Sequence, residues 1–365
     1  MIVTFPHMGN VYIGAKVLME GLGVDIVVPP ISTDRALEIG SAYAPEFICA
    51  PLKINIGNYI ESIEKGADTI LITGSDGPCR FGFYGIMEKE ILKDMGYDIE
   101  FIIFEAPEGD VKELIRRIQK ATQTKNIGKI AKQIIKAQRI IIETDALDRR
   151  MLNIEAREME KGSIRKIRKN FKNQTRNVKG EKELKELISH TSNKLDKVII
   201  NKLHKPLKIG LIGEIYTLIE PYINLYVEEK LARLGVEVDR SLYVGDWLSE
   251  HLLYRPMGLT KEFKIRKAGK QYLDRCIGGH AWETIGYAAH YCQSGYDGII
   301  QLLPFGCMPE IVAESILPSI QKDYNVPIMT LVLDELTGET GYQTRLEAFV
   351  DMIQRKKERR ERYNA

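Results

Sequence analysis

The chain has 365 residues, of which 44% are hydrophobic, and this share is enough for sizeable cores and argues against a disordered chain. Its net charge of +2 hides an uneven distribution, because residues 107–205 carry 26 Lys and Arg against 13 Asp and Glu, whereas the remainder carries 26 against 37. Five scattered cysteines, an odd number, do not suggest a disulfide framework. A length of this order allows two domains and a smaller third element.

The first hundred residues alternate short apolar runs with helical patterns. This alternation predicts βαβ units and a parallel sheet. The expected strands are residues 1–5, 24–28, 69–73 and 100–104, and the expected helices are residues 14–22, 54–65 and 85–95. We therefore predict a first α/β domain over residues 1–109.

Residues 110–205 have a different character. Lys, Arg, Gln and Glu dominate, and apolar residues recur at helical spacing. This pattern predicts a basic helical insertion or linker. Its charge favours either a solvated helical bundle or a surface for an acidic partner or a phosphate-bearing ligand. Phe171 is the only aromatic residue in the stretch, so no nucleic-acid partner is expected.

The α/β pattern returns after residue 206 and predicts a second domain over residues 206–343. A polar C-terminal helix is expected within residues 344–365. The expected strands are residues 208–212, 236–238, 298–303 and 328–333, and the expected helices cover residues 221–234, 287–292, 311–320 and 344–362.

The two α/β halves resemble each other. Residues 22–26, LGVDI, match residues 234–238, LGVEV, and residues 66–71, GADTIL, match residues 295–300, GYDGII. Each of the latter segments leads into a strand and then into a loop cysteine, Cys79 or Cys307. The fold class we predict is therefore α/β, with two similar doubly wound parallel-sheet domains of Rossmann or flavodoxin-like type, joined by the basic helical insertion.

The repeat selects three of the five cysteines. Cys79 and Cys307 follow strands and precede helices, and in a parallel sheet ligands gather at the carboxyl ends of strands. Cys49 also precedes a predicted helix, and its counterpart in the second half is Gly278, beside Gly279 and His280. Helix N-termini favour the thiolate form of cysteine. We therefore expect three thiolates to converge on one cleft if the two domains face each other.

Three thiolates suit an iron–sulfur cluster with one open iron, or zinc completed by His280 or His290. The competing interpretation is that scattered cysteines are small buried hydrophobic residues, which Cys276 and Cys292 fit best. Arg80 could bind an anion or orient a cluster. The remaining polar candidates for this region, each of which could equally be a helix cap or a surface charge, are Lys53, Asp76, Glu214, Glu283 and Glu310.

Several common features are absent from the sequence. Residues 1–10 show no signal-peptide pattern, and no apolar run reaches the length of a membrane helix. There is no C-x-x-C, P-loop, H-E-x-x-H or G-x-G-x-x-G motif. We expect a cytoplasmic protein with reduced thiols, no membrane partner and no ATP hydrolysis of its own.

Six segments carry a resemblance to a known family: 4–10, 46–58, 66–85, 213–235, 278–289 and 304–320. The most specific contain GPCRFG and PFGCMPE. They resemble proteins related to 2-hydroxyacyl-CoA dehydratase components, in the branch related to acyl-CoA dehydratase activases, and more distantly double-cubane cluster proteins. The resemblance covers both α/β halves and, more loosely, the helical middle.

The resemblance implies a [4Fe-4S] cluster bound by Cys49, Cys79 and Cys307, with a larger [8Fe-9S] cluster or zinc as alternatives. It implies an ATP-hydrolysing activator as electron donor, an acyl-CoA or other small molecule as substrate, and a related subunit or a second copy as partner. Arg80 and His280 would then stabilise charge or move protons. The alternatives are a cluster-bearing carrier, scaffold or assembly partner of a larger anaerobic redox complex, and a metal-free interaction protein.

Overall fold

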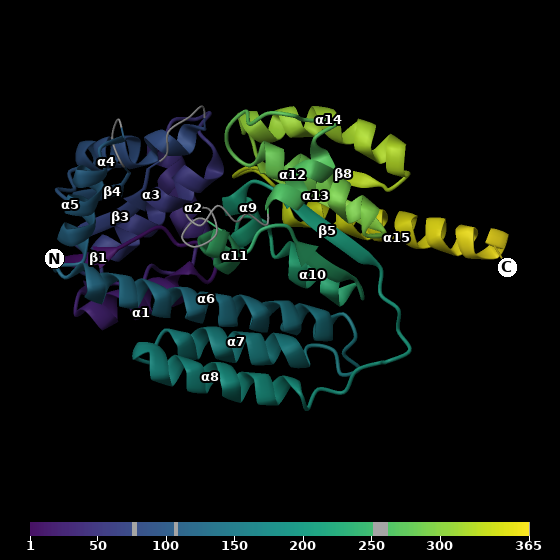
Figure 1. The fold of residues 1–365 in the computed structure, drawn as a ribbon, viewed down its shortest axis with the longest axis horizontal. Helices are drawn as coiled ribbons and strands as arrows, with labels where there is room; N and C mark the ends of the chain where they lie inside the picture. The colour runs from purple at the N-terminus through teal and green to yellow at the C-terminus, as the bar shows by residue number, and fades with distance from the viewer. Residues whose placement is uncertain (75–78, 106–108, 251–261, 365) are drawn as a thin grey trace. The chain divides into compact units, whose positions relative to one another are not determined.

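The computed structural model describes residues 1–74, 79–105, 109–250 and 262–364, and the chain divides into two compact units (Figure 1). Unit 1 comprises Met1–Thr144 and Asn173–Leu187, and unit 2 comprises Asp145–Lys172 and Ile188–Ala365. The described residues form one four-stranded parallel sheet in each unit. The predicted α/β class with two parallel sheets is thus confirmed.

The sheet of unit 1 has the strand order β2-β1-β3-β4, and every strand pair in it is parallel. Its strands are β1 (Ile2–Thr4), β2 (Asp25–Ile26), β3 (Thr69–Thr73) and β4 (Glu100–Phe104). The helices between and after them are α1 (Val11–Leu22), α2 (Asp34–Tyr43), α3 (Ala50–Ile63), the short 3₁₀ helix η1 (Arg80–Phe83), α4 (Tyr84–Asp94) and α5 (Val111–Ala121).

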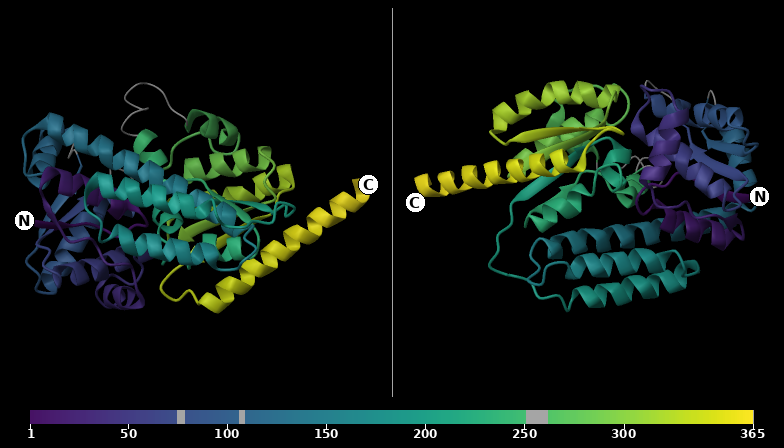
Figure 2. Two further views of the ribbon diagram at one scale, coloured as in Figure 1. Left: turned by 90° about the horizontal axis from the view of Figure 1, so that it is seen from below. Right: turned by 180° about the vertical axis from the view of Figure 1, so that it is seen from behind.

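The sheet of unit 2 has the equivalent order, β6-β5-β7-β8, again with every pair parallel. Its strands are β5 (Lys208–Gly213), β6 (Glu237–Arg240), β7 (Gly298–Pro304) and β8 (Ile328–Leu333). Its helices are α9 (Ile215–Ile219), α10 (Val227–Arg233), α11 (Val244–Ser249), α12 (Glu262–Gly269), α13 (Ala281–Gln293), α14 (Met308–Tyr324) and α15 (Glu339–Asn364), whose C-terminal end extends beyond the rest of the unit in Figure 2.

The basic middle of the chain is helical, as its periodicity predicts. It forms α5 followed by three longer helices that run alongside one another in both figures, α6 (Ile127–Glu155), α7 (Ser163–Thr175) and α8 (Gly180–Leu195). Ion pairs connect α6 to both neighbours, through Lys136 to Glu181 of α8 and through Glu155 to Arg168 of α7. Each of these three helices contributes residues to both units, and the assignment of this segment as an insertion stays a prediction.

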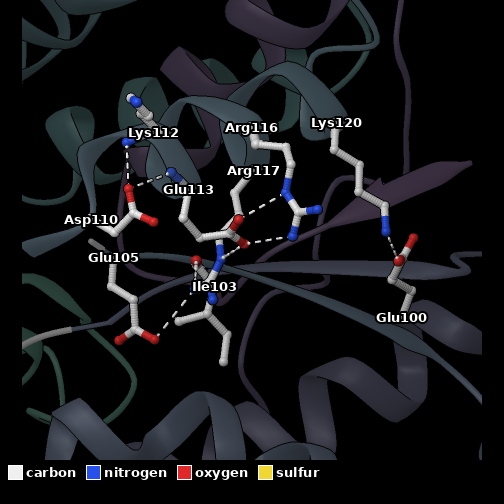
Figure 3. Close-up of polar contacts among 9 residues, drawn as sticks. All are labelled: Glu100, Ile103, Glu105, Asp110, Lys112, Glu113, Arg116, Arg117 and Lys120. Atoms are coloured by element: carbon white, nitrogen blue, oxygen red, sulfur yellow. Dashed lines mark hydrogen bonds and ion pairs between the residues drawn. The ribbon is translucent and has the colours of Figure 1, made fainter. Parts of the chain in front are cut away.

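Cations of the basic middle form ion pairs with nearby carboxylates, as the contacts around α5 show (Figure 3). Arg116 and Arg117 both pair with Glu113 on the same helix, and Lys120 pairs with Glu100 of β4. These pairs offset part of the charge of α5, so the excess of cations counted from the sequence overstates the charge available to a partner. Exposed ion pairs of this kind contribute little to stability, at most about 1 kcal/mol each.

The repeat seen in the sequence is also present in the hydrogen bonds of the two units. At the end of α1, the amide of Val24 donates to Met19, and the matching amide of Val236 donates to Leu231. Gly23 and Gly235 both adopt positive φ there, which glycine tolerates without strain. A carboxylate directly before the third strand of each unit accepts from the backbone amide of the neighbouring first strand, Asp68 from Ile2 and Asp297 from Lys208.

A second repeated feature is a close crossing of two helices. A Cβ on Gly57 of α3 would lie 2.0 Å from the backbone oxygen of Ala36 in α2, and Gly40 of α2 is equally tight against Lys53. In unit 2, Gly269 and Gly286 make the corresponding crossing of α12 and α13, with the same spacing of 17 residues in the sequence. Residues 50–62 of α3 are all buried, so this helix lies inside unit 1.

One predicted helix begins in the wrong place. Residues 221–234 were expected to be helical throughout, but α10 starts at Val227. Leu225 and Tyr226 have φ of 52° and 57°, a left-handed conformation that interrupts a right-handed helix. The amide of Tyr226 instead donates to the carbonyl of Pro221, closing a turn before the helix.

No helix in the described part of the chain combines the length and the apolar character needed to cross a membrane.

Candidate functional site

The strand order identifies where each unit can bind a ligand. In unit 1 the chain moves from β1 to β2 on one side and to β3 on the other, so the loops after β1 and β3 diverge at the carboxyl edge of the sheet. In unit 2 the same reversal lies between β5 and β7. Open parallel sheets bind ligands at such switch points.

The three cysteines selected from the sequence all lie directly before a helix at these edges. Cys49 is the N-cap residue of α3, Cys79 of η1, and Cys307 of α14. Cys79 follows β3 and Cys307 follows β7, the two strands that flank the switch points. Cys49 and Cys79 belong to unit 1, and Cys307 belongs to unit 2.

Two hydrogen bonds hold the cysteine loops of unit 1 together. The guanidinium of Arg80 donates to the carbonyl of Phe47 over 2.8 Å, which connects the loop after β3 to the loop before α3. The hydroxyl of Tyr84, in the first turn of α4, lies 2.7 Å from Sγ of Cys49. Arg80 thus has a positioning contact with the backbone, and Tyr84 is a residue that sequence reasoning missed.

In unit 2, polar side chains gather around the first turn of α14. Glu310 is 1% exposed and accepts hydrogen bonds from the Thr284 hydroxyl at 2.9 Å and the Gln301 amide at 3.0 Å. Burial raises the pKa of Glu310 to about 7, and the carboxylates of Glu214 and Glu283 act in the same direction. The sequence showed Glu310 only as a first-turn carboxylate, because its burial depends on packing between α13 and β7.

His280 lies near the same group of carboxylates. It is the N-cap residue of α13, and its positive charge acts to lower the pKa of Glu214, which burial raises. A Cβ on the neighbouring Gly279 would lie 2.8 Å from Cγ of Pro309 in α14, so this loop packs against the helix that Cys307 begins. The geometry therefore brings His280 to the Cys307 side of unit 2.

The other candidates from the sequence have ordinary structural contacts. Lys53 is buried and donates to the carbonyl of Glu46, and Glu214 caps α9 by accepting from the amides of Tyr216 and Thr217. Glu283 pairs with Arg266. Asp76 lies outside the described residues.

The remaining two cysteines differ from the first three. Cys292 is buried inside α13, and burial raises its pKa to about 12, which keeps it a neutral thiol. Cys276 is exposed. All five cysteines are described, and no disulfide joins any of them. Among the described side chains, no group of three or more His, Cys, Asp or Glu is arranged to hold a metal ion.

A buried carboxyl group on the helix that follows the Cys79 loop was not expected. Glu88 of α4 is fully buried and accepts hydrogen bonds from Asn55 at 3.0 Å and Tyr59 at 3.2 Å. Burial raises its pKa to about 8, and the two hydrogen bonds only partly oppose this. Glu88 is therefore protonated at neutral pH, in the core beside the helix that Cys49 begins.

We expect the stability of the protein to depend on the pH through Glu88. The folded chain keeps the Glu88 proton up to about pH 8, whereas in the unfolded chain it is lost near the ordinary value of 4.5. Between these values the folded state binds more protons, so its stability falls as the pH rises. Glu88→Gln removes this contribution. The unfolding free energy of the variant relative to wild type should therefore increase with pH by up to roughly 1 kcal/mol per unit.

Urea denaturation at several pH values between 5 and 8 measures this difference. Glu90→Gln, at an exposed position of the same helix, is the matched control and should leave the pH profile unchanged. Parallel profiles for wild type and Glu88→Gln would show that Glu88 is ionised in the folded protein.

A comparison with family models gives no match for this chain, and a comparison with curated proteins gives none either.

Proposed function

We propose that this protein is an iron–sulfur protein that holds a [4Fe-4S] cluster through Cys49, Cys79 and Cys307. Its class would be that of the 2-hydroxyacyl-CoA dehydratase components it resembles, with two flavodoxin-like domains. The observation that carries the proposal is the pairing of cysteine loops in unit 1, where Arg80 and Tyr84 connect the Cys49 and Cys79 loops through hydrogen bonds. Cys307 has the equivalent place, after the third strand of its sheet, in unit 2.

The chemistry of the donor set fits such a cluster. Thiolate sulfur is the usual ligand of iron–sulfur clusters, and the N-terminal ends of helices stabilise negative charge on residues placed there. The two cysteines outside the set fit it poorly, since Cys292 is a buried neutral thiol inside a helix and Cys276 has no counterpart in the repeat. Three ligands on a four-iron cluster leave one iron for a ligand from outside the protein.

The protein's own residues would have distinct roles. A bound cluster would accept and pass on single electrons at low potential, supplied by an ATP-hydrolysing partner. Arg80 would hold the two cysteine loops of unit 1 in register through the Phe47 carbonyl. His280 and Glu310, whose pKa burial raises to about 7, would hold protons on the Cys307 side of unit 2.

Anaerobic purification with iron, sulfide and zinc analysis tests the proposal. We expect about four iron and about four sulfide per chain, with an EPR signal on reduction. Cys49→Ser, Cys79→Ser and Cys307→Ser should each lose most of the cluster, whereas Cys276→Ser, the matched control, should retain it. Full retention in the first three variants, or zinc at about one per chain in place of iron, would overturn the assignment.

A second measurement separates a catalytic role from that of a carrier. The reduced, cluster-loaded protein is mixed with acyl-CoA compounds in the presence of an ATP-driven reductant. Substrate turnover supports an enzyme component with an open iron site. A spectral change without turnover would instead favour the alternative function, a cluster-bearing carrier, scaffold or assembly partner in a larger redox complex.

A further inference from the structure

The side chain of Tyr84 contacts a proposed ligand sulfur directly. It begins α4, is only 4% exposed, and its hydroxyl lies 2.7 Å from Sγ of Cys49, 35 residues earlier in the chain. The ring of Phe81 packs against it with 5.3 Å between the ring centres. Tyr84 and Cys49 both belong to the buried core cluster of unit 1, so packing holds their contact on several sides.

The chemistry of a ligand sulfur fixes the direction of this hydrogen bond. A cysteine that binds iron is a thiolate and has no proton to donate, so the Tyr84 hydroxyl must be the donor. A hydrogen bond to a ligand sulfur withdraws electron density from it. This stabilises the more negative, reduced state of a cluster more than the oxidised state and so raises the reduction potential.

The sequence repeat supports a specific link between these two residues. The place of Cys49 in the second half is occupied by Gly278, which has no sulfur. Tyr84 lies five residues after Cys79, and the residue five after Cys307 is Val312, which has no hydroxyl. The sulfur and the hydroxyl are therefore both present in unit 1 and both missing from the corresponding places in unit 2.

We propose that Tyr84 is a positioning residue that donates a hydrogen bond to the ligand sulfur of Cys49 and thereby raises the reduction potential of the cluster. This inference rests on the proposed function, because it requires Cys49 to bind a cluster. The Tyr84–Cys49 contact gives unit 1 a means of setting how strong a reductant the partner protein must be. The aromatic ring without its hydroxyl could not donate this hydrogen bond.

The test is a redox titration of wild type, Tyr84→Phe and Tyr59→Phe, followed by EPR under anaerobic conditions. Tyr84→Phe removes only the hydroxyl, and its midpoint potential should shift to a more negative value. Tyr59 is the matched control, because it is a buried tyrosine in the same core cluster whose hydroxyl donates to Glu88 rather than to sulfur. Its variant should keep the wild-type potential.

A second readout does not depend on how much cluster each variant holds. In deuterated water, pulsed EPR of the reduced protein should detect an exchangeable deuteron near the cluster in wild type and Tyr59→Phe. The coupling of the Tyr84 hydroxyl deuteron should be missing from Tyr84→Phe, whereas deuterons of water at the open iron remain in all three proteins. Equal potentials and equal deuteron signals in wild type and Tyr84→Phe would overturn this inference alone. A wild-type protein without iron and sulfide would overturn the proposed function and this inference with it.

Discussion

Replacing Gly57 with alanine should lower the free energy of unfolding by about 3 kcal/mol or more and reduce binding of the cluster that we propose. The added Cβ would lie 2.0 Å from the backbone oxygen of Ala36, and within 2.5 Å of its carbonyl carbon and Cα. Backbone atoms cannot rotate out of the way as a flexible side chain can, so α2 and α3 would have to separate. The gain in helix propensity from glycine to alanine, about 1 kcal/mol, is too small to offset this.

The expected effect on the proposed cluster follows from the position of Cys49. It is the N-cap residue of α3, so a shift of this helix moves the sulfur relative to Tyr84 and the Cys79 loop. Chemical denaturation gives the loss of stability, and iron analysis of the folded fraction gives the loss of cluster. Gly341→Ala is the control, because an added Cβ there has no neighbour within 4 Å and alanine favours the helix. An unfolding free energy of Gly57→Ala within about 1 kcal/mol of wild type would contradict the close approach of α2 and α3 at this position.

The second large effect concerns Arg168, a buried cation in unit 2. Its guanidinium pairs with Glu155 of α6 at 2.6 Å and with Glu229 of α10 at 3.4 Å. The side chains of Arg168 and Glu155 are 7% and 1% exposed. Arg168→Met leaves Glu155 without its counter-charge in the core, and removing one partner of such a pair costs about 3–5 kcal/mol. We therefore expect a loss of this size at neutral pH.

The pH dependence of this loss of stability shows whether it comes from the uncompensated charge of Glu155 or from lost packing. Burial already raises the pKa of Glu155, and Arg168 is the main group opposing the rise. Without Arg168 the pKa rises further, so the folded variant takes up a proton more readily as the pH falls. The difference between Arg168→Met and wild type should therefore be smaller at pH 5 than at pH 8.

Denaturation at the two pH values measures this difference. The double variant Glu155→Gln with Arg168→Met should be more stable than Arg168→Met alone, because it removes the uncompensated charge. Lys169→Met, at the next and exposed position of α7, should change stability by less than about 0.5 kcal/mol. A loss for Arg168→Met that is the same at both pH values would assign the effect to packing.

Local patterns predicted most of the secondary structure correctly. Three strands, β3, β4 and β8, have the predicted bounds, because each is a short run rich in apolar residues. The pattern missed α2, whose low apolar content conceals a helix capped by the side chain of Thr33. The pattern also extended α10 across Tyr226, because no local feature of the sequence indicates the positive φ of this residue.

The sequence predicted that the three cysteines lie in loops before helices, but it did not predict which side chains contact them or lie buried nearby. Cys79 and Cys307 were selected because they stand at corresponding loops of a repeated pattern, and Cys49 because it precedes a predicted helix; their role as ligands stays a prediction. Tyr84, Glu88 and the buried network of Glu310 could not be found in this way. Their partners lie 35, 33 and 26 residues away in the chain, on helices whose approach depends on packing.

The sequence alone predicts two similar α/β halves and a basic helical middle, and it places three cysteines in loops before predicted helices. The periodicity of apolar residues and the spacing of the repeat carry this information locally. Three other features became visible in the folded chain: glycines let α3 approach α2, Arg80 and Tyr84 connect the cysteine loops, and a neutral carboxyl lies in the core of unit 1. These features depend on which helices meet and how closely, and this is set by close packing of residues distant in the sequence.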